Sequence, residues 1–262
     1  MKKIFLFLSL CLGLSGRAYA NGFQQMMNVS IGIFDAATIL LDYNASVENY
    51  EISAEVKTAN LFDTLYPFVG RYSSNGRILK TKGENQNVLP VTYQTYTKSR
   101  NHVRTKTIFY NDEGFAYQRI STKDEKKNVV PITGVPKTAD AADLQTIFAE
   151  LIGNFNQTRS CRLVREVYDG KKHYNVVAQD EGTENRYFSL LKRTENSYKC
   201  SMYIENLKDN NDNILWDVSA ETPIYFWIGV EQNAKLPYVL EIRIDSTPLG
   251  ALKVLPTSLK IK

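Results

Sequence analysis

The side chains that could take part in chemistry are few in this chain of 262 residues. The two histidines, His102 and His173, lie in alternating polar and apolar segments, and no nucleophile signature such as G-x-S-x-G is present. Nucleophilic catalysis requires a base within hydrogen-bond reach of a nucleophile. We therefore interpret both histidines as strand surface residues and predict a protein that is not an enzyme, has no catalytic residues and binds no cofactor.

A run of aspartates and asparagines, residues 209–213, is the one segment that suggests a metal ion. Oxygen atoms at alternate positions can hold Ca²⁺, but a calcium loop also needs glycine at its sixth position and a bidentate glutamate at its twelfth. Those positions hold Ile214 and Ala220. We predict a polar hairpin loop here and no metal site in the chain.

Two cysteines, Cys161 and Cys200, lie beyond the N-terminal segment. Redox pairs usually have the spacing C-x-x-C, and a metal site needs more ligands than two cysteines and two distant histidines. In an oxidising compartment an even number of cysteines favours a disulfide. We predict a structural disulfide between Cys161 and Cys200.

The beginning of the chain indicates the compartment. Two lysines precede an apolar run, residues 4–14, and small residues lead up to Ala20. This is the layout of a secretory signal peptide, and the run is too short to span a bilayer. We predict a signal peptide, residues 1–20, cleaved between Ala20 and Asn21, and a periplasmic mature protein with no transmembrane span. The alternative, a lipoprotein signal ending at Cys11, is disfavoured because leucine precedes that cysteine where a small residue is expected.

Charge gives no reason to expect nucleic acid as a partner. The net charge of +4 belongs largely to the signal, which contains three basic residues and no acidic one, so residues 21–262 are close to neutral. A mixed-charge cluster, residues 123–127, is interpreted as a solvated loop, and contact with anionic lipid head groups is its alternative role.

The elements that must position these side chains are mostly strands. Period-two alternation recurs in about a dozen short segments, such as residues 50–56 and 224–230, and turn pairs such as Asn75-Gly76 supply the positive φ angles of tight hairpins. The pattern predicts a single mainly β domain, residues 21–262. We expect an antiparallel curled sheet or incomplete β-barrel, because curling limits the exposed edges.

One segment has helical spacing instead. Its apolar residues fall on one helical face: Leu144, Ile147, Phe148, Leu151 and Ile152. Asp140 can cap this helix and Gly153 can end it. Before it, residues 121–139 are charged and then proline-rich, and we predict a long surface connection there. We expect one amphipathic helix, packed against the concave side of the sheet.

Aromatic residues are numerous, with sixteen Tyr, twelve Phe and two Trp. Residues 225–227, Tyr-Phe-Trp, place bulky groups on both faces of one strand. A packed core with a cross-strand pair accounts for them, and so does an apolar cavity for a lipid-like ligand, which a curled sheet can offer. We expect the concave face to include one side of residues 225–228 and one side of residues 50–56. Composition leaves both readings open.

A series of short landmarks runs through most of the chain. They are Tyr50-Glu51-Ile52, Ser73-Ser74-Asn75-Gly76-Arg77, Leu89-Pro90-Val91-Thr92-Tyr93, Asp143-Leu144, Cys161, Val167-Tyr168-Asp169-Gly170-Lys171-Lys172-His173-Tyr174, Cys200, Trp227, Leu236-Pro237 and Thr247-Pro248-Leu249-Gly250. With these in order, the chain resembles the bacterial exported-protein family catalogued as domain of unknown function 3108, although that family often has arginine at Lys172 or His173. The resemblance implies a periplasmic β protein similar in shape to lipoprotein carriers with unclosed barrels, and it supplies no catalytic residues.

These observations predict a non-enzymatic periplasmic protein with a binding or scaffolding role in the bacterial cell envelope. Its expected partner is an envelope protein or a lipid-like ligand. The alternative is a carrier or sensor of a hydrophobic, lipid-like envelope ligand. A third possibility, an envelope hydrolase, is disfavoured because the sequence offers no identifiable base.

Overall fold

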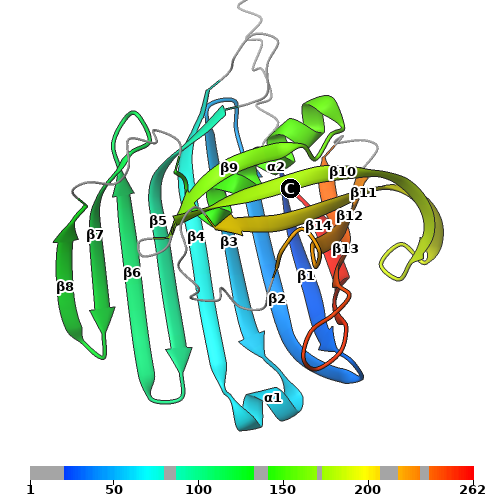
Figure 1. Ribbon diagram of the computed structural model, residues 1–262, viewed down its shortest axis with the longest axis horizontal. Helices are drawn as coiled ribbons and strands as arrows, with labels where there is room; N and C mark the ends of the chain where they lie inside the picture. Colours follow the sequence, from blue (N-terminus) through cyan, green and yellow to red (C-terminus); the bar gives the residue numbers. More distant parts are fainter. Residues whose placement is uncertain (1–20, 80–86, 133–140, 170–172, 207–217, 231–235) are drawn as a thin grey trace, which may run out of the picture.

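The computed structural model describes residues 21–79, 87–132, 141–169, 173–206, 218–230 and 236–262 (Figure 1). The strands are β1 Asn21–Ile31, β2 Phe34–Ala45, β3 Asn49–Thr58, β4 Phe68–Leu79, β5 Asn87–Ser99, β6 His102–Tyr110, β7 Ala116–Lys123, β8 Lys126–Pro131, β9 Leu163–Tyr168, β10 His173–Phe188, β11 Arg193–Asn206, β12 Ile224–Val230, β13 Pro237–Ile244 and β14 Leu252–Ile261. The helices are α1 Asn60–Leu65 and α2 Leu144–Thr158.

The fourteen strands of the described residues form one antiparallel sheet in the order β8-β7-β6-β5-β4-β3-β2-β1-β14-β13-β12-β11-β10-β9. Consecutive strands pair with each other from β1 to β8 and from β9 to β14. The pairing of β1 with β14 joins these two halves of the sheet. The edge strands β8 and β9 are not neighbours, so the barrel is incomplete. The predicted fold class, an antiparallel curled sheet or incomplete β-barrel, is confirmed.

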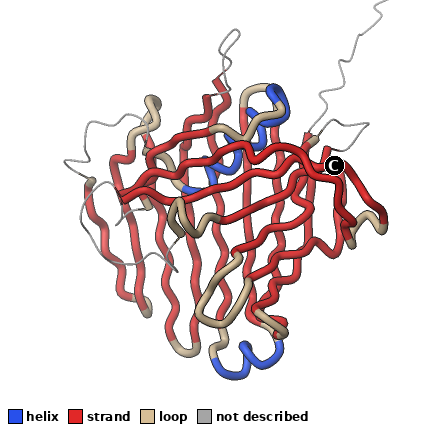
Figure 2. The backbone as a smooth tube through the Cα atoms, turned by 45° about the vertical axis from the view of Figure 1, so that its right-hand side comes forward, coloured by secondary structure: helices blue, strands red, loops and turns tan. Residues whose placement is uncertain are grey.

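The sheet curls around helix α2. Strands β9, β10 and β11 run across β3, β4 and β5, and α2 lies between these two layers (Figures 1 and 2). The helix buries Ile147 and Phe155 against the C-terminal strands and Ala149 against a cluster of the first strands. The expected burial against the concave side is therefore observed. Burial goes beyond one face, because sheet surrounds the helix on two sides.

The helix begins and ends at residues other than the predicted ones. Asp143 is its N-cap, and its carboxylate accepts a hydrogen bond from the backbone N–H of Thr146 at 2.9 Å. Asp140 lies outside the described residues. The helix continues through Gly153, since one interior glycine costs only about 1 kcal/mol, and it ends at Arg159, which has a left-handed φ of 58°.

Two further expectations need correction. The predicted amphipathic helix is α2, and the described residues also contain a helix that was not predicted, α1, whose six residues are too few to give a periodic signal. The predicted connection at residues 121–139 begins as a hairpin of β7 and β8, with the turn at Asp124 and Glu125. Strand β8 is a charged edge strand that ends in proline, and such composition protects a sheet edge but resembles a loop. Residues 133–140 lie outside the described residues.

Candidate ligand-binding cavity

The two histidines are paired with carboxylates. His102 is exposed, and its Nδ1 lies 3.0 Å from Asp124 Oδ2 in the turn after β7. His173 of β10 contacts Glu166 on the adjacent strand β9. Both contacts are between segments that neighbour each other in the sheet, which fits the interpretation as strand surface residues.

The two other candidate groups have different outcomes. Residues 209–213 lie outside the described residues, and the described part of the chain contains no group of three or more potential metal-ligating side chains. Cys161 and Cys200 are placed at bonding distance, with their Cα atoms 6.1 Å apart, as the predicted pairing requires. Both cysteines are fully buried beside Phe155 of α2.

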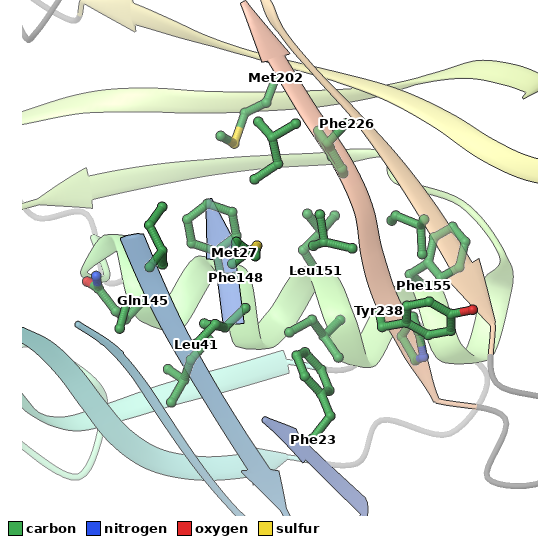
Figure 3. A pocket seen from close by; sticks show the side chains of 18 of the residues that line it. Phe23, Met27, Leu41, Gln145, Phe148, Leu151, Phe155, Met202, Phe226 and Tyr238 are labelled. Carbon is green, nitrogen blue, oxygen red and sulfur yellow. The ribbon is translucent and has the colours of Figure 1, made fainter. Parts of the chain in front are cut away.

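A cavity of about 240 Å³ lies between α2 and the curled sheet (Figure 3). Its lining comes from strands β1–β3, helix α2 and strands β11–β13, namely Phe23, Met27, Ile39, Leu41, Ile52, Ala54, Gln145, Phe148, Leu151, Ile152, Phe155, Met202, Ile224, Phe226, Ile228, Pro237, Tyr238, Val239 and Ile242. Elements that are far apart in the sequence therefore build one site.

Strand alternation explains which side chains face the cavity. Ile52 and Ala54 are two positions apart on β3, and Phe226 and Ile228 are two positions apart on β12, so each pair points to one side of its strand. Both strands were expected to contribute to the concave face, and this is confirmed. Trp227, between the second pair, is buried on the opposite side of β12, where its indole N–H donates to Glu184 at 2.9 Å.

The lining is almost entirely hydrocarbon. Gln145 and the hydroxyl of Tyr238 are its polar contributions among the described residues, and no charged side chain lines it. A buried charge without a partner is strongly unfavourable, so a ligand group inside this cavity must itself be apolar. An engineered apolar cavity of about 150 Å³ stays dry and binds benzene. The present cavity is larger and has the same chemical character.

The sequence matches a family model described as "Protein of unknown function (DUF3108)" over residues 23–253. The chain belongs to the DUF3108 family. Its fold is similar to the crystal structure of a β-barrel-like protein of domain of unknown function DUF1849 from Brucella abortus. The TM-score is 0.51 at 8% sequence identity, covering 93% of this chain and 98% of that one. At this identity the likeness concerns the fold alone. No curated protein matches the sequence.

Sequence reasoning did not foresee a buried polar network in this DUF3108 chain, at the N-terminus of α2. Asp143 is fully buried, and its Oδ2 accepts hydrogen bonds from Thr146 Oγ1 at 2.7 Å and Ser74 Oγ at 3.0 Å. The hydroxyl of Tyr50 lies 2.7 Å from Thr146 Oγ1. The network ties the helix start to β3 and β4. Asp143, Ser74 and Tyr50 each belong to a landmark of the DUF3108 resemblance, but nothing in the sequence indicated that they meet.

Burial raises the pKa of Asp143 from 3.8 to about 6, although hydrogen bonds from Thr146 and Ser74 partly offset the shift. The folded protein therefore binds a proton more tightly than the unfolded chain does. The resulting stabilisation is complete below pH 3.8 and is lost as the pH rises through 6. At pH 7 the ionised carboxylate costs about 3 kcal/mol, since one pKa unit corresponds to about 1.4 kcal/mol.

Replacing Asp143 by asparagine should remove this pH dependence. Asparagine caps helices as well as aspartate does but carries no charge. We expect the unfolding free energy of the variant, relative to that of the wild type, to rise by about 3 kcal/mol from pH 3 to pH 7. Urea denaturation at several pH values measures this difference. Asp63→Asn, which removes an exposed carboxylate of α1, is the matched control. Parallel pH profiles for Asp143→Asn and wild type would contradict the argument.

Proposed function

We propose that this protein is a non-enzymatic binding protein of the bacterial cell envelope that takes a hydrophobic, lipid-like ligand into the cavity beneath α2. The observation that carries the proposal is an apolar cavity of about 240 Å³, whose lining contains no charged side chain among the residues that the structure describes. Protein interiors are normally packed without voids of this size. The cavity therefore favours a carrier or sensor over a scaffold with a packed interior.

The lining also supports a role without catalysis. Acid–base and nucleophilic catalysis need titratable or nucleophilic groups that reach the substrate. Among the described residues, the cavity presents aliphatic and aromatic groups together with Gln145 and Tyr238. Such a surface can select a ligand by shape and apolar area.

We further propose that the protein works in the periplasm after cleavage between Ala20 and Asn21. The basic and then apolar start of the chain supports export. The buried pair Cys161 and Cys200 suits an oxidising compartment. No helix of the described residues has the length and apolar character needed to cross a membrane.

Binding of an uncharged fluorescent probe tests the proposed function. Protein extracted from the periplasm, with its N-terminus determined and expected at Asn21, is titrated with N-phenyl-1-naphthylamine. We expect saturable micromolar binding. Ala54→Phe places a ring in the cavity and should weaken binding at least tenfold, or about 1.4 kcal/mol, with little loss of stability because the ring fills an existing void.

The control is Ser53→Phe, which places the same ring on the opposite face of β3 and should leave probe binding unchanged. A packed scaffold would behave differently. It would bind no probe, and Ala54→Phe would destabilise it by about 1–3 kcal/mol through overpacking. Either result would overturn the proposal in favour of a scaffold.

A further inference from the structure

Six exposed apolar side chains lie on three turns of the sheet. Ile33 and Phe34 are at the turn between β1 and β2. Leu61, Leu65 and Tyr66 belong to α1 and its end, and Leu249 is in the turn between β13 and β14. Ile33 is 91% exposed and Leu249 is 65% exposed. We call these six residues the apolar rim. Exposed apolar side chains that gather on neighbouring turns often mark an interaction site.

The three turns are neighbours at one end of the sheet. The backbone N–H of Gly32 donates to the carbonyl of Ala251 at 3.0 Å, which joins the first and third turns. The N–H of Ala59, just before α1, donates to the carbonyl of Ala36 at 2.9 Å. Figures 1 and 2 both show α1 and these turns at the same end of the molecule.

The apolar rim is continuous with the wall of the cavity. Phe62 of α1 packs against a buried apolar cluster that contains Met27, and the same cluster is contacted by Ile39, Ile224 and Ile242. These three residues also line the cavity. One uninterrupted apolar region therefore runs from the exposed turns to the proposed ligand site.

Basic residues outnumber acidic ones in five turns at the same end. Because the strands alternate in direction, the turns between β1 and β2, β3 and β4, β5 and β6, β7 and β8, and β13 and β14 share this end. They span residues 31–36, 56–70, 98–104, 122–127 and 243–253, with nine basic and five acidic side chains. This excess of four contrasts with the near-neutral charge of residues 21–262 as a whole.

One of these basic groups is fixed at the rim itself. Arg100 donates from Nη2 to the carbonyl of Leu65 at 2.9 Å, and its guanidinium lies 5.8 Å from the ring centre of Tyr66. A cation beside exposed aliphatic and aromatic side chains is the combination that binds the interface of an anionic bilayer. There the apolar groups enter the boundary of the acyl chains while the cations contact phosphate.

We propose that the apolar rim docks on a bilayer containing anionic phospholipids. Apolar tips with surrounding basic charge fit such a surface better than they fit a second copy of this chain, whose corresponding end is equally basic. This docking rests on the proposed function for ligand exchange. A docked protein would hold the apolar region between the rim and the cavity against the bilayer, from which a lipid-like ligand could enter. The docking step itself is measured without reference to the cavity.

Co-sedimentation with vesicles tests the docking. We expect the purified protein to bind vesicles of phosphatidylethanolamine and phosphatidylglycerol in a 3:1 ratio, and to bind phosphatidylcholine vesicles much more weakly. The double variant Ile33→Asp/Leu249→Asp should bind the anionic vesicles at least tenfold more weakly. Val164→Asp is the matched control, because Val164 on β9 is also 65% exposed but lies outside the rim, and it should bind like the wild type.

Three results would overturn the docking proposal. The first is no binding of the wild type to anionic vesicles, and the second is an equal loss in Val164→Asp. The third is a wild-type dimer in size-exclusion chromatography that the double variant converts to monomer without a change in vesicle binding. The double variant should still bind N-phenyl-1-naphthylamine in solution. Vesicle binding that persists in a protein without probe binding would contradict the proposed function but not the docking.

Discussion

Phe155→Ala should lower the free energy of unfolding by about 3–5 kcal/mol, the usual cost of truncating a buried phenylalanine. The side chain is fully buried between α2 and the C-terminal strands. Its ring packs edge-on against Tyr198 of β11, with ring centres 5.0 Å apart. Because the residue also borders the cavity, truncation enlarges an existing void, and the surrounding chain has little means of collapsing onto it. Urea denaturation of the two proteins measures the loss.

Phe34→Ala is the control for this prediction. The same atoms are removed from a side chain that is 49% exposed at the end of the sheet, so the loss should be well below that of Phe155→Ala. A loss near zero for Phe155→Ala would mean that α2 does not pack as described here. It would also remove the helix from the wall of the cavity.

Local pattern was enough to predict many of the strands and that residues 50–56 and 225–228 contribute one side each to the concave face, because side-chain direction in a strand depends on position along it. It was not enough for β1 and β2, which were not predicted, or for Asn75-Gly76, which was predicted as a tight turn and lies inside β4. The way in which the two halves of the sheet, β1–β8 and β9–β14, are joined could not be predicted from local pattern. It depends on the pairing of β1 with β14, which are separated by almost the whole chain, and no local feature of either strand specifies the other.

The errors at the helix and at β8 have tertiary causes. Asp140 and Asp143 are equally good caps by residue type, but Asp143 accepts a hydrogen bond from Ser74 of β4, and its partner Thr146 is bonded to Tyr50 of β3. Ser74 and Tyr50 are invisible in the helix sequence. Strand β8 was mistaken for a loop because it contains lysines and a proline, which are typical of loops. In β8 these residues protect the edge of the sheet from pairing with another chain.

The residue types of the interior could not predict the cavity. Phe148, Leu151 and Phe226 would be equally suited to a solid core. Packed and hollow interiors use the same apolar residues and differ only in how completely side chains from opposite walls meet. That depends on the separation of α2 from β1–β3 and β11–β13, which strand patterns do not encode. The sequence therefore predicted which strands contribute to the concave face, but it could not predict the volume of the cavity.

The disulfide should make the second large contribution to stability. Cys161 lies in the connection between α2 and β9, and Cys200 lies in β11, so the bridge passes over β10 and fixes the edge of the sheet. Asp180 of β10 anchors the same connection. Its carboxylate accepts from the backbone N–H of Cys161 at 2.6 Å and from Ser160 Oγ at 2.8 Å. Asp180 therefore holds the Cys161 end of the bridge next to β10.

Cys161→Ser should lower the free energy of unfolding by about 4 kcal/mol, the chain-entropy value for a loop of this length. The positions joined are 39 residues apart. Ser160→Ala removes one hydrogen bond to Asp180 from the same connection and should cost only about 1 kcal/mol, which separates loss of the bridge from disturbance of the segment. Amide hydrogen exchange should speed up first in β9, because this edge strand has β10 as its main partner. Free thiols on both cysteines in protein taken from the periplasm, or unchanged stability of Cys161→Ser, would show that the edge is held by Asp180 and packing alone.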